Sequence, residues 1–571
     1  MQSNRLDLLK ITQVQDVELQ KGQETLNGTL HLTVHHLIFR HVQELTEELK
    51  ELWIPYPIMH TVERQPASLH NGRHPLYIRC RDFMTLTFGL LKEGEAQDVF
   101  ETIQKLACVS SVEQLYAYSY QPQVPFSTSG GWNTYDPLKE YERMGIGSSD
   151  KWRFTIINRD YKYSPTYPRT LVVPSKISDA VLTHAAKYRS KARIPALSYL
   201  HWYNSATITR CSQPFTGVKR ARSIQDEKLI ESIFSSNVPT GPNGETLYGS
   251  TAANLIVDAR PMANAVANAA RGAGSECMDN YRNCTRIYVP IDNIHVMRDS
   301  LAKLCEGMQG IDSGGQVNKQ TLHRSGWLRH IAILMEGTKE VVKYVHVFNS
   351  HVLVHCSDGW DRTSQLVSLG ELCLDPYYRT FEGLQVLIEK DWVSFGHKFQ
   401  DRSGHLTNEK YFVNLVNTGG NAATNTIKDM QNKFYKSNYY QKETSPVFHQ
   451  FLDCVYQLIC MFPNRFEFNV EMLHDLHYHL YSCQFGTFLF NCEADRHQHK
   501  PQEKTLSIWD YFNTNREKYI NTLYDPMRDK DLVDDGGVLI PDPTKVRYWA
   551  SLFKREDDEV NGSLIPSPEN I

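Results

Sequence analysis

The stretch Val352 to Thr363, VLVHCSDGWDRT, places a thiol and a guanidinium on one short loop. A run of β-branched and leucine residues leads into His355 and Cys356, and five residues separate Cys356 from Arg362. A new apolar helical pattern then begins near Leu366. This order of strand, loop and helix directs backbone N–H groups and the positive end of the helix dipole into the loop, so it predicts a site for a phosphate dianion.

The residue types of the loop suit nucleophilic attack on a phosphate ester. The local positive field lowers the pKa of Cys356 and holds it as a thiolate, while Arg362 offers a planar fork for two phosphoryl oxygens. A leaving alkoxide needs a proton, and Asp358 and Asp361 are both candidate acids. We predict that the phosphate contacts the intervening residues Ser357, Asp358, Gly359 and Trp360. Since Arg362 and the amides supply the positive charge, we expect no metal and no cofactor.

The elements around this loop indicate an α/β fold. Leu255 to Val257 and Val352 to Val354 are typical of buried strands, and Arg298 to Met308 is an amphipathic helix. We therefore predict a central mixed sheet flanked by helices, in a large domain over residues 131–555. Residues 406–444 show little apolar periodicity and are interpreted as a mobile insertion, and residues 556–571 as a disordered tail.

A smaller domain is predicted to precede it, over residues 1–118. Gly28 to Phe39, Leu52 to Val62 and Leu76 to Phe88 read as short strands, and Glu95 to Cys108 reads as a helix. Several strands followed by one helix are typical of a pleckstrin-homology-like barrel, although a plain β domain without a ligand has the same pattern. Residues 119–130, rich in Pro, Ser and Thr, are predicted to form the linker.

Composition excludes several classes of protein. The 571 residues carry 61 Lys and Arg against 65 Asp and Glu, a net charge of −4, which disfavours a dedicated nucleic-acid binder. No apolar run is long enough to span a membrane, and charged residues interrupt the N-terminus where a secretory signal would need an apolar core. The 12 cysteines form no CxxC pair, so we expect reduced thiols in the cytoplasm. Asp495 to His499 is interpreted as a solvated loop and not as a metal site.

Several blocks, in addition to HCSDGWDRT, carry a resemblance over nearly the whole chain. They are EYERMGI from Glu140, YPRTLVVP from Tyr167, RIPALSYL from Arg193, RCSQPFTG from Arg210, DARPMANAVAN from Asp258, NIHVMR from Asn293, WVSFGHKF from Trp392, SPVFHQFLDC from Ser445 and CQFGTFL from Cys483. In this order they resemble the myotubularin family of phosphoinositide 3-phosphatases, within the Cys-x5-Arg phosphatase superfamily. The resemblance implies an N-terminal domain of the PH-GRAM type.

The resemblance also implies an activity. Inactive family members lack the nucleophile or the arginine, whereas this chain keeps Cys356 and Arg362. Attack by Cys356 on the 3-phosphate of phosphatidylinositol 3-phosphate, or of phosphatidylinositol 3,5-bisphosphate, is then expected to give a cysteinyl-phosphate, with Asp361 as the acid and Asp358 as second choice. Two Asp and no Lys in the loop argue against a heavily phosphorylated headgroup. A phosphotyrosine protein phosphatase and a lipid-binding adaptor remain as alternatives.

Matched positions outside the loop suggest further substrate contacts. Asn268 and Asn293 are candidate hydrogen-bond partners of the headgroup, although either asparagine could instead cap a helix. Lys398 and Arg402 lie four apart, on one face if the stretch is helical, and could bind a second phosphate or form a solvated salt-bridging pair. Relatives carry Arg at both places, and Lys398 is a point charge and not a fork.

The family resemblance also sets expectations about location and partners. We expect a cytoplasmic protein that binds reversibly to phosphoinositide lipids on endosomal or vacuolar membranes. Neither the coiled coil nor the FYVE zinc finger of many animal relatives is recognisable, so self-association has no obvious basis in the sequence. The compact layout is similar to that of fungal members.

Overall fold

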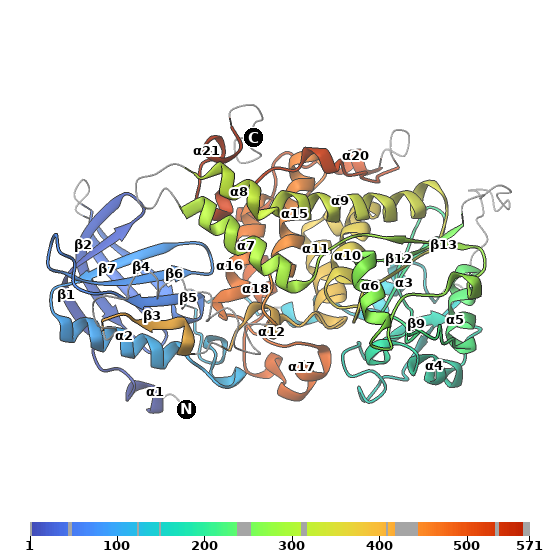
Figure 1. The fold of residues 1–571 in the computed structure, drawn as a ribbon, viewed down its shortest axis with the longest axis horizontal. Coiled ribbons are helices and arrows are strands. Elements are labelled where there is room, and N and C mark those ends of the chain that lie inside the picture. The colour runs from blue at the N-terminus through green and yellow to red at the C-terminus, as the bar shows by residue number, and fades with distance from the viewer. Residues whose placement is uncertain are drawn as a thin grey trace.

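The computed structural model describes residues 3–43, 48–122, 125–128, 130–147, 150–236, 253–309, 317–406, 409–416, 443–530 and 536–562. Figure 1 shows a curled sheet with a helix along it at one end of the molecule, and a larger part with its own sheet and most of the helices. None of the described helices combines the length and the hydrophobicity that crossing a bilayer requires.

The N-terminal sheet curls around its own apolar core, which helix α2 (Glu93–Ala107) completes. Its strand order is β15-β5-β6-β7-β1-β2-β3-β4. The strands are β1 Gln13–Lys21, β2 Glu24–Leu32, β3 His36–Val42, β4 Leu49–Pro55, β5 Met59–Arg64, β6 His74–Cys80, β7 Thr85–Leu90 and β15 Phe412–Asn414. Val99, Phe100 and Ile103 form part of the apolar face of α2, so the predicted helix is confirmed and begins two residues early.

Each of the three strand segments predicted in this domain contains parts of two strands. Between β2 and β3 the Thr33 hydroxyl oxygen accepts the backbone N–H of His36 at 2.9 Å, which closes a turn. A 3-10 turn at Tyr56–Ile58 separates β4 from β5, and Phe83, with φ +67°, turns the chain between β6 and β7. The apolar pattern continues across these tight turns, so periodicity did not reveal them.

The second sheet is mixed, as predicted, and carries the functional loop. Its order is β10-β11-β14-β12-β13, and its strands are β10 Ala196–Leu200, β11 Thr207–Cys211, β12 Asn254–Asp258, β13 Cys284–Tyr288 and β14 Val352–His355. β10 runs antiparallel to β11, whereas the four others run parallel. The carboxyl ends of β11, β14, β12 and β13 therefore lie at one edge of the sheet. A separate hairpin pairs β8 (Trp152–Thr155) with β9 (Leu171–Pro174).

Both faces of this sheet are packed against apolar side chains, because successive residues of each strand point to opposite faces. Ile256 and Leu353 pack with Ile230 of α5 (Ile224–Phe234) in one cluster, while Val257 and Val354 belong to the main core. The remaining helices are α1 Ser3–Leu6, α3 Pro137–Arg143, α4 Asp179–Ala186, α6 Met262–Ala269, α7 Ile294–Gln309, α8 Lys319–Ser325, α9 Trp327–Val342, α10 Arg362–Leu374, α11 Phe381–Ile388, α12 Phe399–Ser403, α15 Val447–Met461, α16 Val470–Ser482, α17 Glu493–His499, α18 Ile508–Thr514, α19 Arg516–Tyr519, α20 Pro526–Lys530 and α21 Asp557–Asn561.

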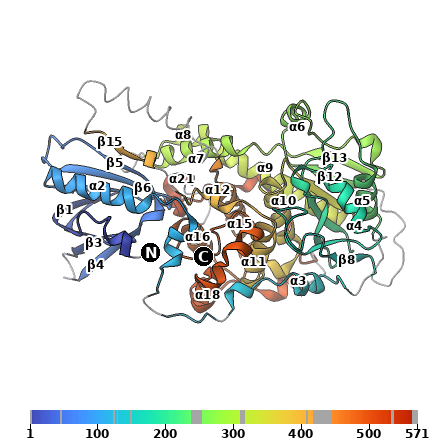
Figure 2. The same ribbon diagram turned by 90° about the horizontal axis from the view of Figure 1, so that it is seen from below.

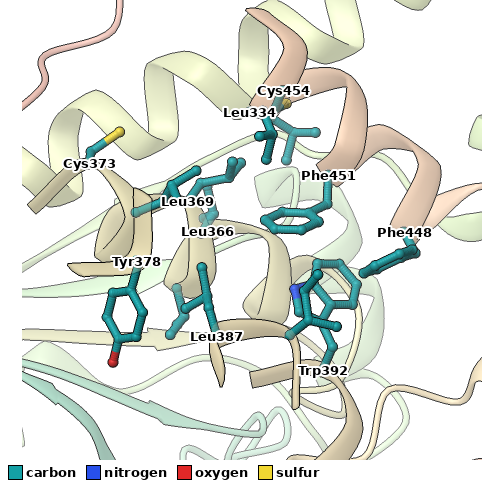
Figure 3. Close-up of a cluster of buried hydrophobic side chains, with 14 of the residues drawn as sticks. Leu334, Leu366, Leu369, Cys373, Tyr378, Leu387, Trp392, Phe448, Phe451 and Cys454 are labelled. Atoms are coloured by element: carbon teal, nitrogen blue, oxygen red, sulfur yellow. The ribbon is translucent and has the colours of Figure 1, made fainter. Parts of the chain in front are cut away.

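Helix α10, which follows the functional loop, lies inside the main core. Figure 3 shows Leu366 and Leu369 of α10 among Leu334 of α9, Phe451 of α15 and Trp392. All of these side chains are fully buried, and the rings of Trp392 and Phe451 are 5.0 Å apart. Close packing on every side fixes the position of α10. The loop at its N-terminus is therefore held by a helix that is buried in the main core.

Two segments predicted to be irregular contain regular structure. In the predicted insertion over residues 406–444, Phe412–Asn414 forms β15, which pairs in parallel with β5 of the N-terminal sheet. The segment was wrongly interpreted there because an edge strand of three residues leaves no periodicity to read. In the predicted tail, Asp557–Asn561 forms α21, and Val560 packs into the main core. Residues 417–442 and 563–571 lie outside the described residues.

The histidine-rich stretch is also better ordered than predicted. Asp495 to His499 is not a loop but the end of helix α17, where the Arg496 guanidinium forms an ion pair with buried Glu389 at 2.7 Å. The described residues contain no group of three or more His, Cys, Asp or Glu side chains arranged to hold a metal ion.

The N-terminal domain also contacts the larger domain at the C-terminal end of α12. The Arg81 guanidinium, from the turn between β6 and β7, donates to the carbonyl oxygens of Ser403 at 2.6 Å and Gly404 at 3.1 Å. In the predicted linker the described residues form neither helix nor strand, and the Phe126 ring packs against Phe485 and Tyr511. The N-terminal domain is therefore joined to the larger one through β15, Arg81 and the linker.

Candidate active site

The predicted nucleophile lies just after the carboxyl end of β14, on a loop that closes with the first turn of α10. Cys356 is 3% exposed, and its Sγ accepts a hydrogen bond from the backbone N–H of Gly359 at 3.3 Å. Gly359 has φ +77°, and a Cβ atom there would lie 2.4 Å from the carbonyl oxygen of Cys211. A residue without a side chain is therefore required where the loop passes β11 and folds back over the sulfur.

Two buried arginines hold the back of the loop. The carbonyl oxygen of Gly359 accepts from Arg193 at 2.9 Å and from Arg210 at 3.0 Å. Arg210 is itself held by an ion pair with Asp391 at 2.9 Å. Because the C=O and N–H of a trans peptide point in opposite directions, this contact turns the N–H of Trp360 away from the arginines. The carbonyl that would repel a bound anion is thereby held on the far side of the loop.

The loop lowers the pKa of the Cys356 thiol. Burial alone would raise this pKa, but the charge of Arg362 and the hydroxyl and amide of Thr363 outweigh burial, so the pKa lies below that of an ordinary cysteine. Burial acts in the opposite direction on other cysteines and raises the pKa of Cys108 and of Cys373 to about 12. Cys356 therefore has the thiolate character that a nucleophile needs.

Arg362 lies beside the thiol and retains its charge for a ligand. Its guanidinium donates to the carbonyl oxygen of Ile291 at 3.2 Å and to the hydroxyl of Ser357 at 3.2 Å. Among the described residues, no carboxylate lies within ion-pair distance of this group, in contrast to Arg210 behind the loop, which pairs with Asp391. The arrangement suits a fork that grips phosphoryl oxygens.

Asp361 is buried at the N-terminus of α10, where its carboxylate contacts Arg402 and His397. The Arg402 guanidinium reaches its carboxylate at 2.9 Å, and Nδ1 of His397 lies 3.0 Å from it. Burial would raise the pKa of Asp361, but Arg402 and His397 hold it well below its ordinary value. In the free protein, Asp361 is therefore an ionised carboxylate.

The three other loop residues differ in burial, because Ser357 and Asp358 are half-buried and Trp360 is buried. The carboxylate of Asp358, half-buried, accepts from the Ser190 hydroxyl at 2.9 Å. The Ser357 carbonyl oxygen accepts the backbone N–H of Gln213 at 3.0 Å, and the Trp360 ring lies 5.1 Å from Nζ of Lys398. The structure thus brings all the predicted loop residues together, and it adds Gln213 to them.

Lys398 and Arg402 both belong to the start of α12 but contact different groups. Lys398 is the N-cap residue of α12 (φ −76°, ψ 68°), and its carbonyl oxygen accepts the backbone N–H of Arg402 at 2.8 Å. Its Nζ lies 3.2 Å from Asp401. Arg402 is not solvated either: it is 6% exposed and lies between Asp361 and Glu443. The positive charge of Arg402 is therefore paired with carboxylates of the protein itself, one of which is Asp361.

The two asparagines differ in what they contact. Oδ1 of Asn293 accepts the backbone N–H groups of His295 at 3.0 Å and Val296 at 3.2 Å, so Asn293 caps α7. The helix-capping interpretation is confirmed for this residue. Asn268, near the end of α6, donates to Oε1 of Gln213 at 3.4 Å. Asn268 is thus linked to the loop through Gln213, whose backbone N–H binds the Ser357 carbonyl oxygen.

A buried charged network beneath the loop escaped the sequence analysis. His355 donates from Nδ1 to the Cys356 carbonyl oxygen at 3.1 Å, and its Nε2 lies 3.0 Å from Glu276. Burial would lower the pKa of His355, but Glu276 and Asp258 raise it above the ordinary value. Arg189 in turn pairs with Glu276 at 2.7 Å. This network fixes the backbone on either side of the thiol.

A signal for these residues was present in the sequence. Arg193, Arg210, Asp258 and His397 all lie within the apolar blocks RIPALSYL, RCSQPFTG, DARPMANAVAN and WVSFGHKF. Charged residues in buried segments must be paired, because leaving them unpaired in the interior is costly. Asp258 pairs with nearby Arg260. The groups that Arg193, Arg210 and His397 contact are distant in the sequence, and periodicity does not identify them.

Comparison with known proteins agrees with this geometry. A family model described as the myotubularin-like phosphatase domain matches residues 115–497, and one described as the MTMR6-9 GRAM domain matches residues 10–107. The chain is 37% identical to the phosphoinositide 3-phosphatase of Saccharomyces cerevisiae, over 99% of this chain and 95% of the relative.

Two human relatives are similar over almost the same region. The chain is 40% identical to phosphatidylinositol-3,5-bisphosphate 3-phosphatase MTMR6 of Homo sapiens, over 97% of this chain and 81% of the relative. It is 36% identical to phosphatidylinositol-3-phosphate phosphatase MTMR7 of Homo sapiens, over 96% and 76%. With its Cys-x5-Arg loop intact and both domains matched, the chain belongs to the myotubularin family of phosphatases.

Proposed function

We propose that this protein hydrolyses the 3-phosphate of phosphatidylinositol 3-phosphate, and of phosphatidylinositol 3,5-bisphosphate, through a cysteinyl-phosphate. The observation that carries the proposal is the buried Cys356 thiol with a lowered pKa beside the guanidinium of Arg362. The names of the relatives from yeast and human support the lipid substrate and the 3-position.

The first step follows from the loop geometry. The Cys356 thiolate attacks phosphorus, the bond from phosphorus to the inositol 3-oxygen breaks, and Sγ carries the phosphoryl group. Arg362 and the loop amides bind the equatorial oxygens, on which charge accumulates in the transition state. The leaving oxygen takes a proton from an acid in the loop.

Asp361 is our first candidate for this acid and Asp358 the second. Asp361 is ionised in the free protein because Arg402 and His397 outweigh its burial. A phosphate dianion in the loop places like charge beside this carboxylate and so raises its pKa when substrate binds. In the second step, the Asp361 carboxylate takes a proton from water as the water attacks the cysteinyl-phosphate, which releases phosphate and restores the thiolate.

Substitution of the two acids is expected to separate their roles. Asp361→Asn should lower kcat for short-chain phosphatidylinositol 3-phosphate by about 10²-fold, because inositol is a poor leaving group without a proton donor. With p-nitrophenyl phosphate, whose leaving group needs no proton, formation of the cysteinyl-phosphate should change by less than about threefold, as measured by the burst of nitrophenolate. Asp358→Asn is the matched control. If Asp358→Asn instead lowers kcat for the lipid and leaves the nitrophenolate burst unchanged, Asp358 and not Asp361 is the acid.

We further propose that the protein acts as a peripheral protein at endosomal or vacuolar membranes. The charge of −4 offers no global attraction to anionic lipid, so a local surface must supply the membrane affinity. The N-terminal domain, matched by a GRAM-domain family model, supports a lipid-directed role for the whole chain.

A substrate panel tests the proposed function directly. Wild-type protein is assayed for phosphate release from dibutanoyl phosphatidylinositol 3-phosphate, its 3,5-bisphosphate, the 4- and 5-monophosphates and a phosphotyrosine peptide. We expect kcat/KM at least about 10²-fold higher for the two 3-phosphorylated lipids, since one pocket that orients the ester decides the position of attack. A preference for the phosphopeptide would indicate a protein phosphatase, and no turnover of any substrate would favour the adaptor function.

A further inference from the structure

The catalytic loop shares its edge of the sheet with two other segments. β11, β12 and β14 run parallel, so the chain leaves each strand at the same edge. The catalytic loop follows β14, residues 212–222 follow β11, and α6 follows β12 after Pro261. In Figure 2, α6 lies at the outer edge of the molecule, beyond β12 and β13.

The two neighbouring segments form one continuous surface that reaches the catalytic loop. The backbone N–H of Gly217 donates to the carbonyl oxygen of Ala273 at 2.9 Å, which joins residues 212–222 to the turn that follows α6. Gln213 bridges both to the site, because it contacts Ser357 by its backbone and Asn268 by its side chain. We call residues 215–222, 262–270 and Arg271 the mouth surface.

The mouth surface exposes apolar side chains that the fold does not use. Met262 is 60% exposed and Val266 is 65% exposed, one turn apart on α6, and Val218 is 76% exposed. Ala265 is the buried residue of this helix. Apolar groups placed together at the rim of a substrate site mark a surface for interaction.

Cations accompany these apolar groups. Lys219, Arg220 and Arg271 are all exposed, and among the described residues none of them lies within ion-pair distance of a carboxylate. Arg222, in contrast, pairs with Glu227 at 2.6 Å. Exposed apolar side chains with unpaired cations beside them match an anionic bilayer, where apolar groups enter the acyl boundary and cations meet the lipid phosphates.

We propose that the mouth surface docks on an anionic lipid bilayer and presents the catalytic loop to a headgroup within it. This inference rests on the proposed lipid substrate, and it adds a surface and a partner to that function. Membrane contact beside the loop brings the substrate ester to Cys356 without lifting the lipid out of the bilayer.

The test uses the full chain and the same headgroup in two physical states. Met262→Gln with Val266→Gln places a good helix former at both positions and adds no charge. Phosphate release is measured from dibutanoyl phosphatidylinositol 3-phosphate in solution, and from dioleoyl phosphatidylinositol 3-phosphate in phosphatidylcholine vesicles containing phosphatidylserine. We expect the vesicle rate to fall by at least about tenfold and the soluble rate to change by less than about twofold.

A matched variant and a charge variant sharpen the result. Val347→Gln removes another exposed apolar group, 52% exposed, which precedes β14 at the opposite edge of the sheet, and it should leave both rates unchanged. Lys219→Gln with Arg220→Gln should lower the vesicle rate when phosphatidylserine is present and have a smaller effect when it is absent. Equal vesicle rates for the wild type and the α6 variant, with the soluble rate intact, would overturn the docking surface. Failure of wild-type protein on the soluble substrate would instead overturn the proposed function.

Discussion

Cys356→Ser is expected to abolish phosphate release from short-chain phosphatidylinositol 3-phosphate, with a loss on the order of 10⁴-fold or more. A serine hydroxyl at this position stays protonated at neutral pH, whereas the field of Arg362 and Thr363 lowers the pKa of the thiol. The substitution keeps the loop amides and Arg362, so soluble headgroup should still bind. Phosphate release measures the loss, and calorimetric titration of the headgroup measures the retained binding.

The control for this variant is a cysteine outside the loop. Cys277 is half-buried and lies 3.7 Å from Asp279, and Cys277→Ser should leave kcat within about twofold, because surface substitutions rarely change a site. Retained turnover by Cys356→Ser would contradict covalent catalysis by this thiol. Loss of both turnover and headgroup binding would show instead that the loop had changed its shape.

Arg362→Lys is expected to lower kcat on the order of 10³-fold although it keeps the charge. The ammonium of lysine is a point charge and cannot hold two phosphoryl oxygens in one plane, which the guanidinium does as the transition state flattens. The headgroup KM should rise much less than kcat falls, because the fork acts mainly on the transition state. Steady-state kinetics on the soluble lipid separate the two effects.

Arg362 also lowers the pKa of the Cys356 thiol, and the rate of thiol alkylation as a function of pH measures this pKa. In the wild type the pKa of Cys356 lies below the ordinary value, so its reaction with iodoacetamide should persist to lower pH than that of a free cysteine. Arg362→Ala removes the favourable charge, which raises this pKa and slows alkylation at neutral pH. Arg362→Lys should shift it less. An unchanged midpoint in Arg362→Ala, read by mass spectrometry, would remove Arg362 from this role.

A chain of contacts leads from Asp361 in the proposed active site to the N-terminal domain. Arg402, which holds it, precedes Ser403 and Gly404, whose carbonyl oxygens accept from Arg81 of the N-terminal domain. The carboxylate proposed as acid thus lies two contacts from the sheet that the GRAM-domain family model matches. These contacts join the two domains beside α12.

Residue types and their spacing along the chain were enough to predict the chemistry of the site and the local elements around it. The spacing of Cys356 and Arg362 between a strand and a helix predicted the phosphate loop, and β12, β14, α2 and α7 lie where apolar periodicity placed them. These features follow from residues close together in the chain, where spacing and period translate directly into structure.

The folded chain sets which groups from distant parts of the sequence come into contact. Arg402 reaches Asp361 across 41 residues, Arg193 reaches the Gly359 carbonyl across 166 residues, and β15 joins a sheet whose other strands end at Leu90. A buried charge must find a partner, but the sequence does not specify which of many distant groups the folded chain will bring to it. For that reason the sequence identified the nucleophile, whereas the ionisation of its neighbours and the exposed surface at its mouth became visible only in the fold.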